Sequence, residues 1–300
     1  MKRYAYNHKR DYARIKAFLT ETFAPERKDK NWFPSRWEYM VYHPYSDHEN
    51  YKLFGIWENT GKIVGFVHYE MTLGEAFFQL RHGYESLKEE MFDYAVDNLK
   101  GRHKNGYQYL RPFLVDDGGT FSEIATKRGF KKLENTTESM SVFDTRQTPT
   151  DYTLPDGFRV RSLDEIGNDA VEKTAHLLWK GFNHEGEMPA NQIEGRKLMV
   201  SAPNFDRRLN CVVLSPDSKF VAYAGIWHER SANAGYVEPV ATHPDYRRLG
   251  LGRAAVLECI KRINELYSAE SVYVGTQMNF YLSFGFKPLY TNHLWEKTFV

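Results

Sequence analysis

The chain has 300 residues, and its 40 lysines and arginines nearly balance its 39 aspartates and glutamates, so the formal net charge at pH 7 is +1. This length allows two domains of ordinary size, and the balanced charge argues against a nucleic acid or an anionic membrane as partner. The sequence has no run of roughly 18 apolar residues that could cross a membrane, no secretory signal and only two cysteines, so we expect a cytoplasmic protein without disulfides or a metal site.

The first half of the chain alternates helical and extended patterns. Apolar residues that recur every three or four positions predict helices, and runs rich in aromatic and β-branched residues predict strands. The expected helices are residues 10–23, 87–99 and 120–127, and the expected strands are residues 52–57, 62–71, 76–80, 107–115 and a last one that ends at Phe143. Residues 146–157 are rich in Pro, Thr and Asp without periodicity, which is typical of a linker. We therefore expect a first domain over residues 1–145.

The second domain, residues 158–300, follows a similar order. After its first strand we expect a helix N-cap at Ser162 or Asp164. The other expected helices are residues 170–182, 192–200 and a long one that begins at residue 251, and the expected strands are residues 158–161, 210–215, 219–227, 236–242 and 271–275. This alternation predicts a mixed α/β sheet with helices on both faces.

A glycine loop between residues 247 and 253 joins a strand to the long helix. Glycines such as Gly250 and Gly252 have no Cβ, so the backbone there can approach a ligand closely. The first N–H groups of the following helix have no intrahelical partner, and the helix dipole is positive at that end. Together with Arg247, Arg248 and Arg253, the loop predicts a pocket for phosphate oxygens. The alternative is an ordinary glycine turn with surface arginines.

The order Arg247-x-x-Gly250-x-Gly252 after a His-Pro turn resembles the pyrophosphate-binding motif of the Gcn5-related N-acetyltransferases (GNAT), which bind acetyl-CoA. A second stretch, residues 279–286, is similar to the last helix and the following strand of that family. In it, Tyr281 takes the position of the usual general acid. The resemblance implies an α/β (α+β) fold of two tandem GNAT-like domains, each with a mixed, mostly antiparallel sheet flanked by helices.

The resemblance also implies where acetyl-CoA binds in the second domain. The backbone groups of Val240 and Thr242 match the strand positions that hold the pantetheine arm, and an N–H near Val240 polarises the thioester carbonyl. The other expected cofactor-binding residues lie in the glycine loop, at the start of the long helix and just before the tyrosine: Arg247, Arg248, Leu249, Gly250, Leu251, Gly252, Arg253 and Asn279. The asparagine of the family usually stands further from the tyrosine than Asn279 does.

Acetyl transfer to an amine needs a group that takes a proton from the amine and one that protonates the leaving thiolate. Glu238 shares a strand face with Val240 and Thr242 and is the candidate base, with a surface or ion-paired glutamate as the alternative. Tyr281 is the candidate acid, with a core tyrosine as the alternative. Pro239 lacks a ladder donor and predicts a bulge or a splayed strand edge.

For other polar residues near the site, the sequence supports a catalytic or acceptor-binding role less strongly. His243 is a second candidate base, but a histidine before a proline turn is commonly structural. The segment His184–Glu187 is expected to border the acceptor pocket, where its carboxylates would suit a cationic amine, although a solvated loop is the preferred explanation.

The first domain resembles a degenerate copy of the second domain. The sequence after Gly129 echoes that after Gly285, but Ala125 stands where the second half has Tyr281. Residues 81–90 have no paired glycines and would place three carboxylates against a pyrophosphate. We therefore expect a degenerate domain that does not bind CoA and instead packs against the second domain and walls its acceptor cleft.

Taken together, these features predict an N-acetyltransferase that moves the acetyl group of acetyl-CoA to a primary amine by direct attack in a ternary complex. A non-catalytic acyl-CoA-binding sensor or regulatory module is the alternative. The expected partner is a small-molecule or peptide amine, and the protein is expected to be a monomer or a homodimer. The identity of the acceptor and the length of the acyl group stay open.

Overall fold

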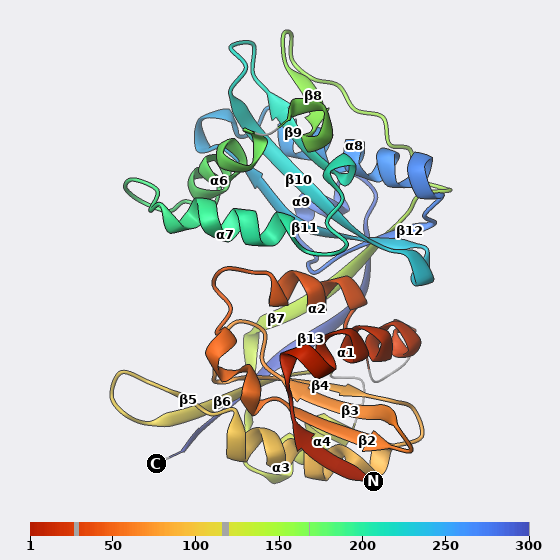
Figure 1. The fold of residues 1–300 in the computed structure, drawn as a ribbon, viewed down its shortest axis with the longest axis vertical. Coiled ribbons are helices and arrows are strands. Elements are labelled where there is room, and N and C mark those ends of the chain that lie inside the picture. The colour runs from red at the N-terminus through yellow and green to blue at the C-terminus, as the bar shows by residue number, and fades with distance from the viewer. Residues whose placement is uncertain (27–29, 116–119, 168, 300) are drawn as a thin grey trace. The chain divides into compact units, whose positions relative to one another are not determined.

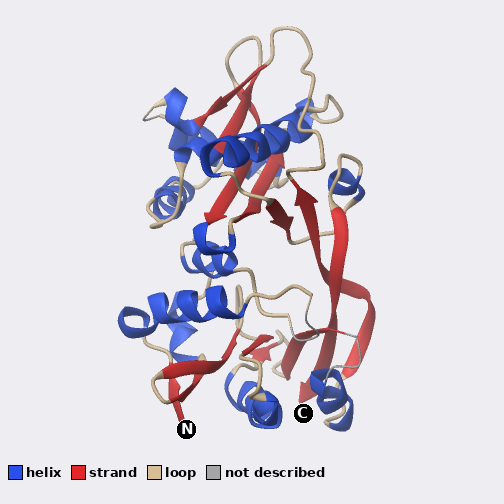
Figure 2. Cartoon of the chain, turned by 90° about the vertical axis from the view of Figure 1, so that its right-hand side faces the viewer, coloured by secondary structure: helices blue, strands red, loops and turns tan. Residues whose placement is uncertain are grey.

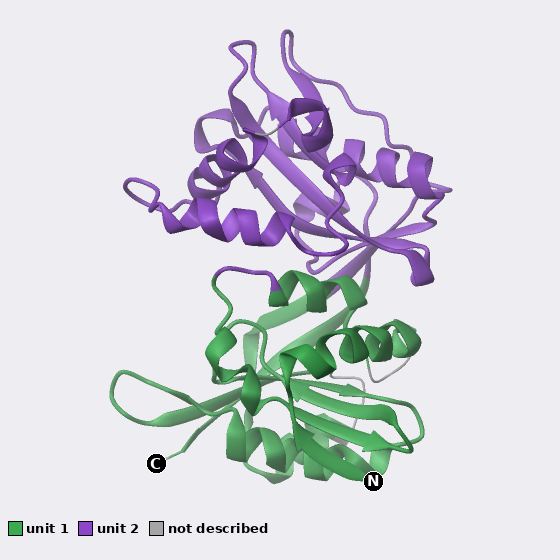
Figure 3. Cartoon of the chain, in the orientation of Figure 1, with its two compact units in different colours: residues 1–41, 45–139, 289–300 green, residues 42–44, 140–288 purple. Residues whose placement is uncertain are grey.

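The computed structural model describes the chain except for residues 27–29, 116–119, 168 and 300. The described chain folds into two compact units, which Figure 3 shows in different colours. Unit 1 comprises residues 1–41, 45–139 and 289–300, and unit 2 comprises residues 42–44 and 140–288. No helix among the described residues combines the length and the apolar character that crossing a bilayer requires.

Unit 1 is built on a mixed sheet with helices packed against it (Figure 1). Its strands are β1 (Lys2–Ala5), β2 (Gly55–Asn59), β3 (Lys62–His68), β4 (Glu75–Leu80), β5 (Gly101–Arg102), β6 (Gln108–Val115), β7 (Lys131–Asp144) and β13 (Lys287–Phe299). Its helices are α1 (His8–Thr22), α2 (Pro34–Val41), α3 (Lys88–Asn98) and α4 (Thr120–Lys127), with 3-10 turns η1 (His48–Leu53) and η2 (Glu85–Leu87). The sheet order is β1-β2-β3-β4-β6-β13-β7, with β5 beside β6. Strands β4 and β6 pair parallel, whereas β1 to β4 and β6 with β13 pair antiparallel.

The last strand of the chain belongs to unit 1. Strand β13 pairs with β6 from Asn292 opposite Val115 to Phe299 opposite Gln108. The sequence pattern placed residues 289–300 with the second half, and the structure places them in unit 1 because their hydrogen-bond partners lie there. The partner of a strand depends on pairing across long sequence separations, which a local pattern does not encode.

Unit 2 carries a second mixed sheet with helices on both sides of its strands (Figure 2). Its strands are β8 (Arg159–Ser162), β9 (Asn210–Leu214), β10 (Phe220–Glu229), β11 (Ala234–Thr242) and β12 (Ser271–Val274). Its helices are α5 (Leu163–Ile166), α6 (Ala170–Gly181), α7 (Asn191–Val200), α8 (Leu251–Tyr267) and α9 (Asn279–Leu282), with 3-10 turns η3 (Arg207–Leu209), η4 (Arg230–Ala232) and η5 (Pro244–Tyr246). The sheet order is β7-β12-β11-β10-β9-β8, in which β11 and β12 pair parallel and the other pairs are antiparallel. The expected fold class is confirmed.

The two faces of this sheet carry different helices. A Cβ added to Gly181 of α6 would lie 2.7 Å from Ala241 Cβ, and one added to Gly252 of α8 would lie 2.8 Å from Thr242 Oγ1. Because neighbouring side chains of a strand point to opposite faces, α6 and α8 cover opposite sides of β11. The expected N-cap at Ser162 is confirmed, since its hydroxyl accepts a hydrogen bond from the Glu165 N–H.

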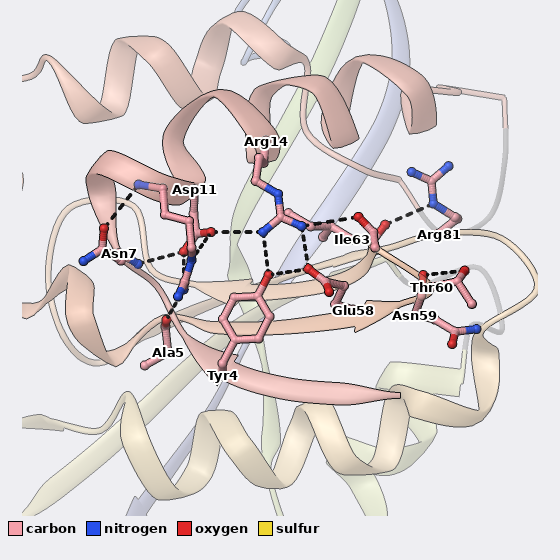
Figure 4. Close-up of polar contacts among 12 residues, drawn as sticks. Tyr4, Ala5, Asn7, Asp11, Arg14, Glu58, Asn59, Thr60, Ile63 and Arg81 are labelled. Carbon is pink, nitrogen blue, oxygen red and sulfur yellow. Dashed lines mark hydrogen bonds and ion pairs between the residues drawn. The ribbon is translucent and has the colours of Figure 1, made fainter.

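A polar cluster ties the first elements of unit 1 together (Figure 4). The Arg14 guanidinium donates to Glu58 of β2, to the Tyr4 hydroxyl of β1 and to Asp11 of its own helix. The Tyr4 hydroxyl in turn donates to Glu58 at 2.9 Å. The Asp11 side chain is fully buried, so the fold depends on its hydrogen bonds being complete.

We expect Asp11→Asn to lower the free energy of unfolding by about 1–3 kcal/mol at pH 7, because the amide leaves buried donors without a charged acceptor. Burial alone would raise the pKa of Asp11, but hydrogen bonds from Arg10 and Asn7 hold that pKa below its ordinary value. The carboxylate therefore stabilises the fold above the ordinary aspartate pKa, and this stabilisation is lost as the pH falls through the lower folded-state pKa.

Urea titrations of both proteins at pH 7 and at about pH 3.5 measure this effect, and the difference between them should shrink at the lower pH. Glu21→Gln is the matched control, because Glu21 lies on the same helix and pairs with Arg81 at an exposed position. Its effect should stay within about 0.5 kcal/mol. A difference for Asp11→Asn that is unchanged between the two pH values would contradict the role given to the charge.

Candidate functional site

Strand β11 parts from one of its neighbours halfway along. It pairs with β12 only from Ala234 to Val237, and β12 ends at Val274. Beyond Val237, β11 continues to Thr242 and stays paired with β10. Within the described residues no strand pairs with the other edge of residues 238–242. The sheet is therefore open on that side.

The backbone groups of two residues face this open edge. The His243 N–H donates to the Val221 carbonyl at 2.9 Å, which fixes the phase of the ladder between β10 and β11. Because successive residues of a strand direct their backbone groups to alternate edges, Val240 and Thr242 direct theirs away from β10. The Thr242 carbonyl accepts a bond from Arg247 Nε at 3.3 Å. The N–H and carbonyl of Val240 and the N–H of Thr242 remain directed toward the opening.

The ladder between β10 and β11 is irregular beside the opening. Its register shifts between Ala224 and Ile226, so that Gly225 lies across from the Glu238–Pro239 peptide, which is cis. The Glu238 carbonyl accepts a hydrogen bond from Trp227 Nε1 at 2.9 Å. The bulge predicted from Pro239 is thus confirmed.

The glycine loop places the start of α8 at the end of β11. Gly250 has φ 78°, a left-handed conformation that favours glycine, and it precedes the first residue of α8. At Gly252 the constraint is space, because a Cβ there would lie 2.8 Å from Thr242 Oγ1 and 3.4 Å from the Phe280 ring. No side chain caps α8, and its first turn has no acidic residue. Its leading N–H groups therefore form a suitable site for an anion.

The three arginines of the loop have different surroundings. The Arg247 guanidinium donates to the Gly181 carbonyl at 2.9 Å and to Asn183 Oδ1 at 2.7 Å, so it holds the loop against the end of α6. Arg253 lies 5.9 Å from the centre of the Phe284 ring. Within the described residues, neither Arg248 nor Arg253 forms an ion pair. Among the described residues, two of the three expected phosphate-binding guanidinium groups are therefore not paired with a carboxylate.

Three other expected cofactor residues differ in the exposure of their side chains. The Leu251 side chain is buried in the core beneath α8, so only its backbone N–H can face a ligand. Leu249 is exposed. Asn279 is also exposed, at the first position of α9. The sequence prediction for these positions stays a prediction.

Tyr281 and Glu238 interact electrostatically in the structure. Tyr281 lies in α9, is buried and packs edge-on against Phe280 and Phe286. Burial raises the pKa of the Tyr281 phenol above its ordinary value, and the negative charge of Glu238 raises it further. The phenol is therefore protonated at neutral pH. Strand β11 and helices α8 and α9 meet here, because Gly252 lies between Thr242 and Phe280.

The weaker candidates lie in structural or exposed positions. His243 Nδ1 accepts a hydrogen bond from the Asp245 N–H at 3.3 Å and so caps the short turn η5. His184, Glu185 and Glu187 are exposed on the loop between α6 and α7. The His184 ring stacks on that of Trp179 at 4.3 Å between centroids.

Sequence reasoning missed a group of polar residues beside the bulge. Arg196 of α7, Tyr223 of β10 and Asn210 of β9 form a hydrogen-bonded chain. A Cβ on Gly225 would lie 2.5 Å from Asn210 Oδ1 and 3.2 Å from the Glu238 carbonyl. None of these residues belongs to a recognisable motif, so only the packing of three elements reveals them.

The corresponding positions of unit 1 keep the backbone turn but carry different side chains. The Phe130 N–H donates to the Ala125 carbonyl at 2.9 Å, as the Phe286 N–H donates to the Tyr281 carbonyl at 3.3 Å in unit 2. In the loop before α3, however, Glu85 Oε1 accepts from the Gly83 N–H at 3.0 Å. A side-chain carboxylate thus occupies the backbone donor at this loop.

We expect Arg247→Ala to lower the free energy of unfolding by about 1 kcal/mol, because three carbonyl and amide oxygens lose a charged donor at a partly solvated position. Arg248→Ala removes the neighbouring guanidinium and should change the stability by less than about 0.5 kcal/mol. Thermal unfolding of both variants beside the parent protein measures the two effects. Equal losses would mean that Arg247 does not hold the loop.

Comparisons with known proteins show which family and which solved structures this chain resembles. Residues 172–286 match the model of the Acetyltransferase (GNAT) family. A GCN5-related N-acetyltransferase from Sphaerobacter thermophilus is 12% identical with a TM-score of 0.64, covering 99% of this chain and 95% of that chain. A tandem GNAT protein from the clavulanic acid biosynthesis pathway is 10% identical with a TM-score of 0.65, covering 99% and 98%.

A GNAT acetyltransferase from Colwellia psychrerythraea is 10% identical with a TM-score of 0.57, and both chains are covered completely. At these identities the similarity establishes the fold, which spans nearly the whole chain. The search of curated proteins finds no match. The expected tandem architecture is confirmed.

Proposed function

Because residues 172–286 match the model of the GNAT family of acetyltransferases, we propose that unit 2 transfers the acetyl group of acetyl-CoA to a primary amine. Membership of the family implies acyl transfer from an acyl-CoA. The observation that carries the finer proposal is the open edge of β11, which ends at the uncapped start of α8 and lies beside Tyr281 and Glu238.

The residues at this edge suit a nucleotide with a pantetheine arm. The N–H groups at the start of α8 and the side chains of Arg248 and Arg253 would bind the pyrophosphate. Gly252 leaves the space that a Cβ would fill. The free backbone groups of Val240 and Thr242 would hydrogen-bond the amides of the arm as a neighbouring strand would. Arg247 positions the loop, and Leu249, Leu251 and Asn279 would line it.

The chemistry then needs few groups. Glu238 would accept a proton from the amine, whose nitrogen forms a bond to the thioester carbon. The Val240 N–H would stabilise the charge that develops on the carbonyl oxygen. Tyr281 would give its proton to the sulfur as the carbon–sulfur bond breaks, so that CoA leaves as a thiol and the acceptor leaves as a neutral amide group. The raised pKa of Tyr281 suits an acid that must keep its proton at neutral pH.

Tyr281→Phe should lower the turnover number by about 10²-fold, because the thiolate then leaves without a positioned acid. The affinity for acetyl-CoA should hardly change, since the ring still packs against Phe286. CoA release and calorimetric titration measure the two quantities. Tyr246→Phe removes a hydroxyl from the turn η5 and is the control. An unaltered rate of Tyr281→Phe, with chemistry rate-limiting, would rule out the acid.

Gly252→Asp should abolish acetyl-CoA binding, because it adds bulk next to Thr242 and negative charge at the pyrophosphate. Gly61→Asp makes the same change in an open turn of unit 1 and should leave the affinity unchanged. Arg248→Ala, at an exposed position, should weaken binding about tenfold without disturbing the fold. Calorimetry on the three folded variants tests the assignment, which fails if Gly252→Asp binds like the parent.

Titration of the intact chain should give one acetyl-CoA site, because in unit 1 Glu85 occupies the loop donor and Ala125 replaces the tyrosine. Two sites would mean that unit 1 also binds. Binding without CoA release across a broad set of amines would favour a sensor over an enzyme. No binding by folded protein would end the proposal.

A further inference from the structure

Helix α7 carries an arginine that is buried without a counter-charge. The Arg196 residue is only 5% exposed, and its guanidinium carbon lies 4.9 Å from the centre of the Tyr223 ring and 5.6 Å from that of Phe205. One terminal N–H donates to the Tyr223 hydroxyl. The Arg196 Nε is buried without an acceptor, and among the described residues no carboxylate forms an ion pair with this guanidinium.

Unit 1 provides a direct contrast. Arg36 is equally buried at 6% exposure, and it forms ion pairs with Glu70 and Glu138. Withdrawing a guanidinium from water is costly unless an opposite charge and hydrogen bonds replace the solvent. The chain provides that replacement for Arg36 and omits it for Arg196. A buried donor without an acceptor needs a physical explanation, and a ligand that supplies the acceptor is one such explanation.

The neighbours of Arg196 orient it but do not neutralise it. The Tyr223 hydroxyl gives its proton to Asn210 Oδ1, and Asn210 Nδ2 donates to the Asp206 carbonyl at 2.7 Å. Burial raises the pKa of Tyr223 to about 12, so the phenol is neutral at physiological pH. The Tyr223 hydroxyl therefore holds one terminal nitrogen of the guanidinium, whereas Nε has no hydrogen-bond partner among the described residues.

This guanidinium lies beside the bulge of the candidate site. The Tyr223 hydroxyl is 2.9 Å and the Glu238 carbonyl is 3.2 Å from the position of a Cβ on Gly225. The Tyr223 hydroxyl, which accepts a hydrogen bond from Arg196, therefore lies near the irregular backbone at Glu238. Helix α7 packs beside α6, on the face of the sheet opposite α8 (Figure 1).

We propose that Arg196 binds a carboxylate of the acceptor, so that the acceptor class is an amine that also carries a carboxylate, such as an amino acid. The planar guanidinium matches a carboxylate in shape and charge. Tyr223 and Asn210 hold it in place, and the amine end of the same molecule reaches Glu238. This inference rests on the proposed function, because it names the substrate class of the same site.

The test uses the intact protein with a panel of L-α-amino and ω-amino acids, each paired with the amine that lacks its carboxylate. CoA release at saturating acetyl-CoA should give a kcat/KM about 10²-fold higher for at least one amino acid than for its paired amine. Arg196→Met should remove that preference, mainly through KM, and leave the affinity for acetyl-CoA unchanged. Lys197→Met, an exposed neighbour that pairs with Glu194, should behave like the parent.

A second measurement separates binding from a structural role. Replacing an unpaired buried charge by an apolar side chain of similar length should keep or raise the melting temperature. The preferred amino acid alone should raise the melting temperature of the parent and not that of Arg196→Met. A lower melting temperature of Arg196→Met, without any loss of amino-acid preference, would show that Arg196 only supports the fold.

The outcomes separate the two proposals. Equal rates for amino acids and paired amines, unchanged in Arg196→Met, would overturn the carboxylate site and leave the acetyltransferase standing. An amino acid that stabilises the parent through Arg196, with no CoA release from any amine, would support the site and overturn the enzyme.

Discussion

The central constraint of unit 2 is that β11 loses β12 as a neighbour after Val237 while it stays paired with β10. Backbone N–H and C=O groups inside a protein need partners, and within the described part of the chain residues 238–242 have a neighbouring strand on one side only. The register shift at Gly225 and the turn of α8 at Gly250 both lie next to this edge. A ligand with its own amides and an anionic end would satisfy a strand edge and a helix start at once, which is why we place acetyl-CoA there.

The two units show how one scaffold can keep or lose its chemistry. Phe130 and Phe286 close the same backbone turn around Ala125 and Tyr281. This turn ends a short helix and begins a strand, so the fold preserves it in both units. The donor groups at the loops are treated differently, since Glu85 occupies the Gly83 N–H of unit 1, whereas the start of α8 has no acidic side chain.

Local patterns in the sequence predicted much of this protein. Spacing predicted the helices around Leu251 and Leu177, because that feature lies within short segments. The two glycines and Tyr281 also lie in short segments, and the site that they predict stays a prediction. Features that depend on contacts between distant parts of the sequence were not predicted. Arg196 has the ordinary sequence context of a solvated helix position, and only the packing of α7 against Tyr223 makes it a buried cation. Helix α2, at residues 34–41, was also missed, since it is short and its residues are buried almost all round.

The position of β13 has a consequence for biosynthesis. This strand lies between β6 and β7 in the sheet of unit 1, yet it follows the whole of residues 140–286 in the sequence. Residues 140–286 are all synthesised before it, so the C-terminal unit can finish folding while the N-terminal unit still has a vacant place in its sheet. Until β13 has been made, the edge of β6 is open to pairing with other chains. Unit 1 is therefore completed only after unit 2 has been synthesised, and deletion of β13 would expose a sheet edge formed by residues that precede unit 2 in the sequence.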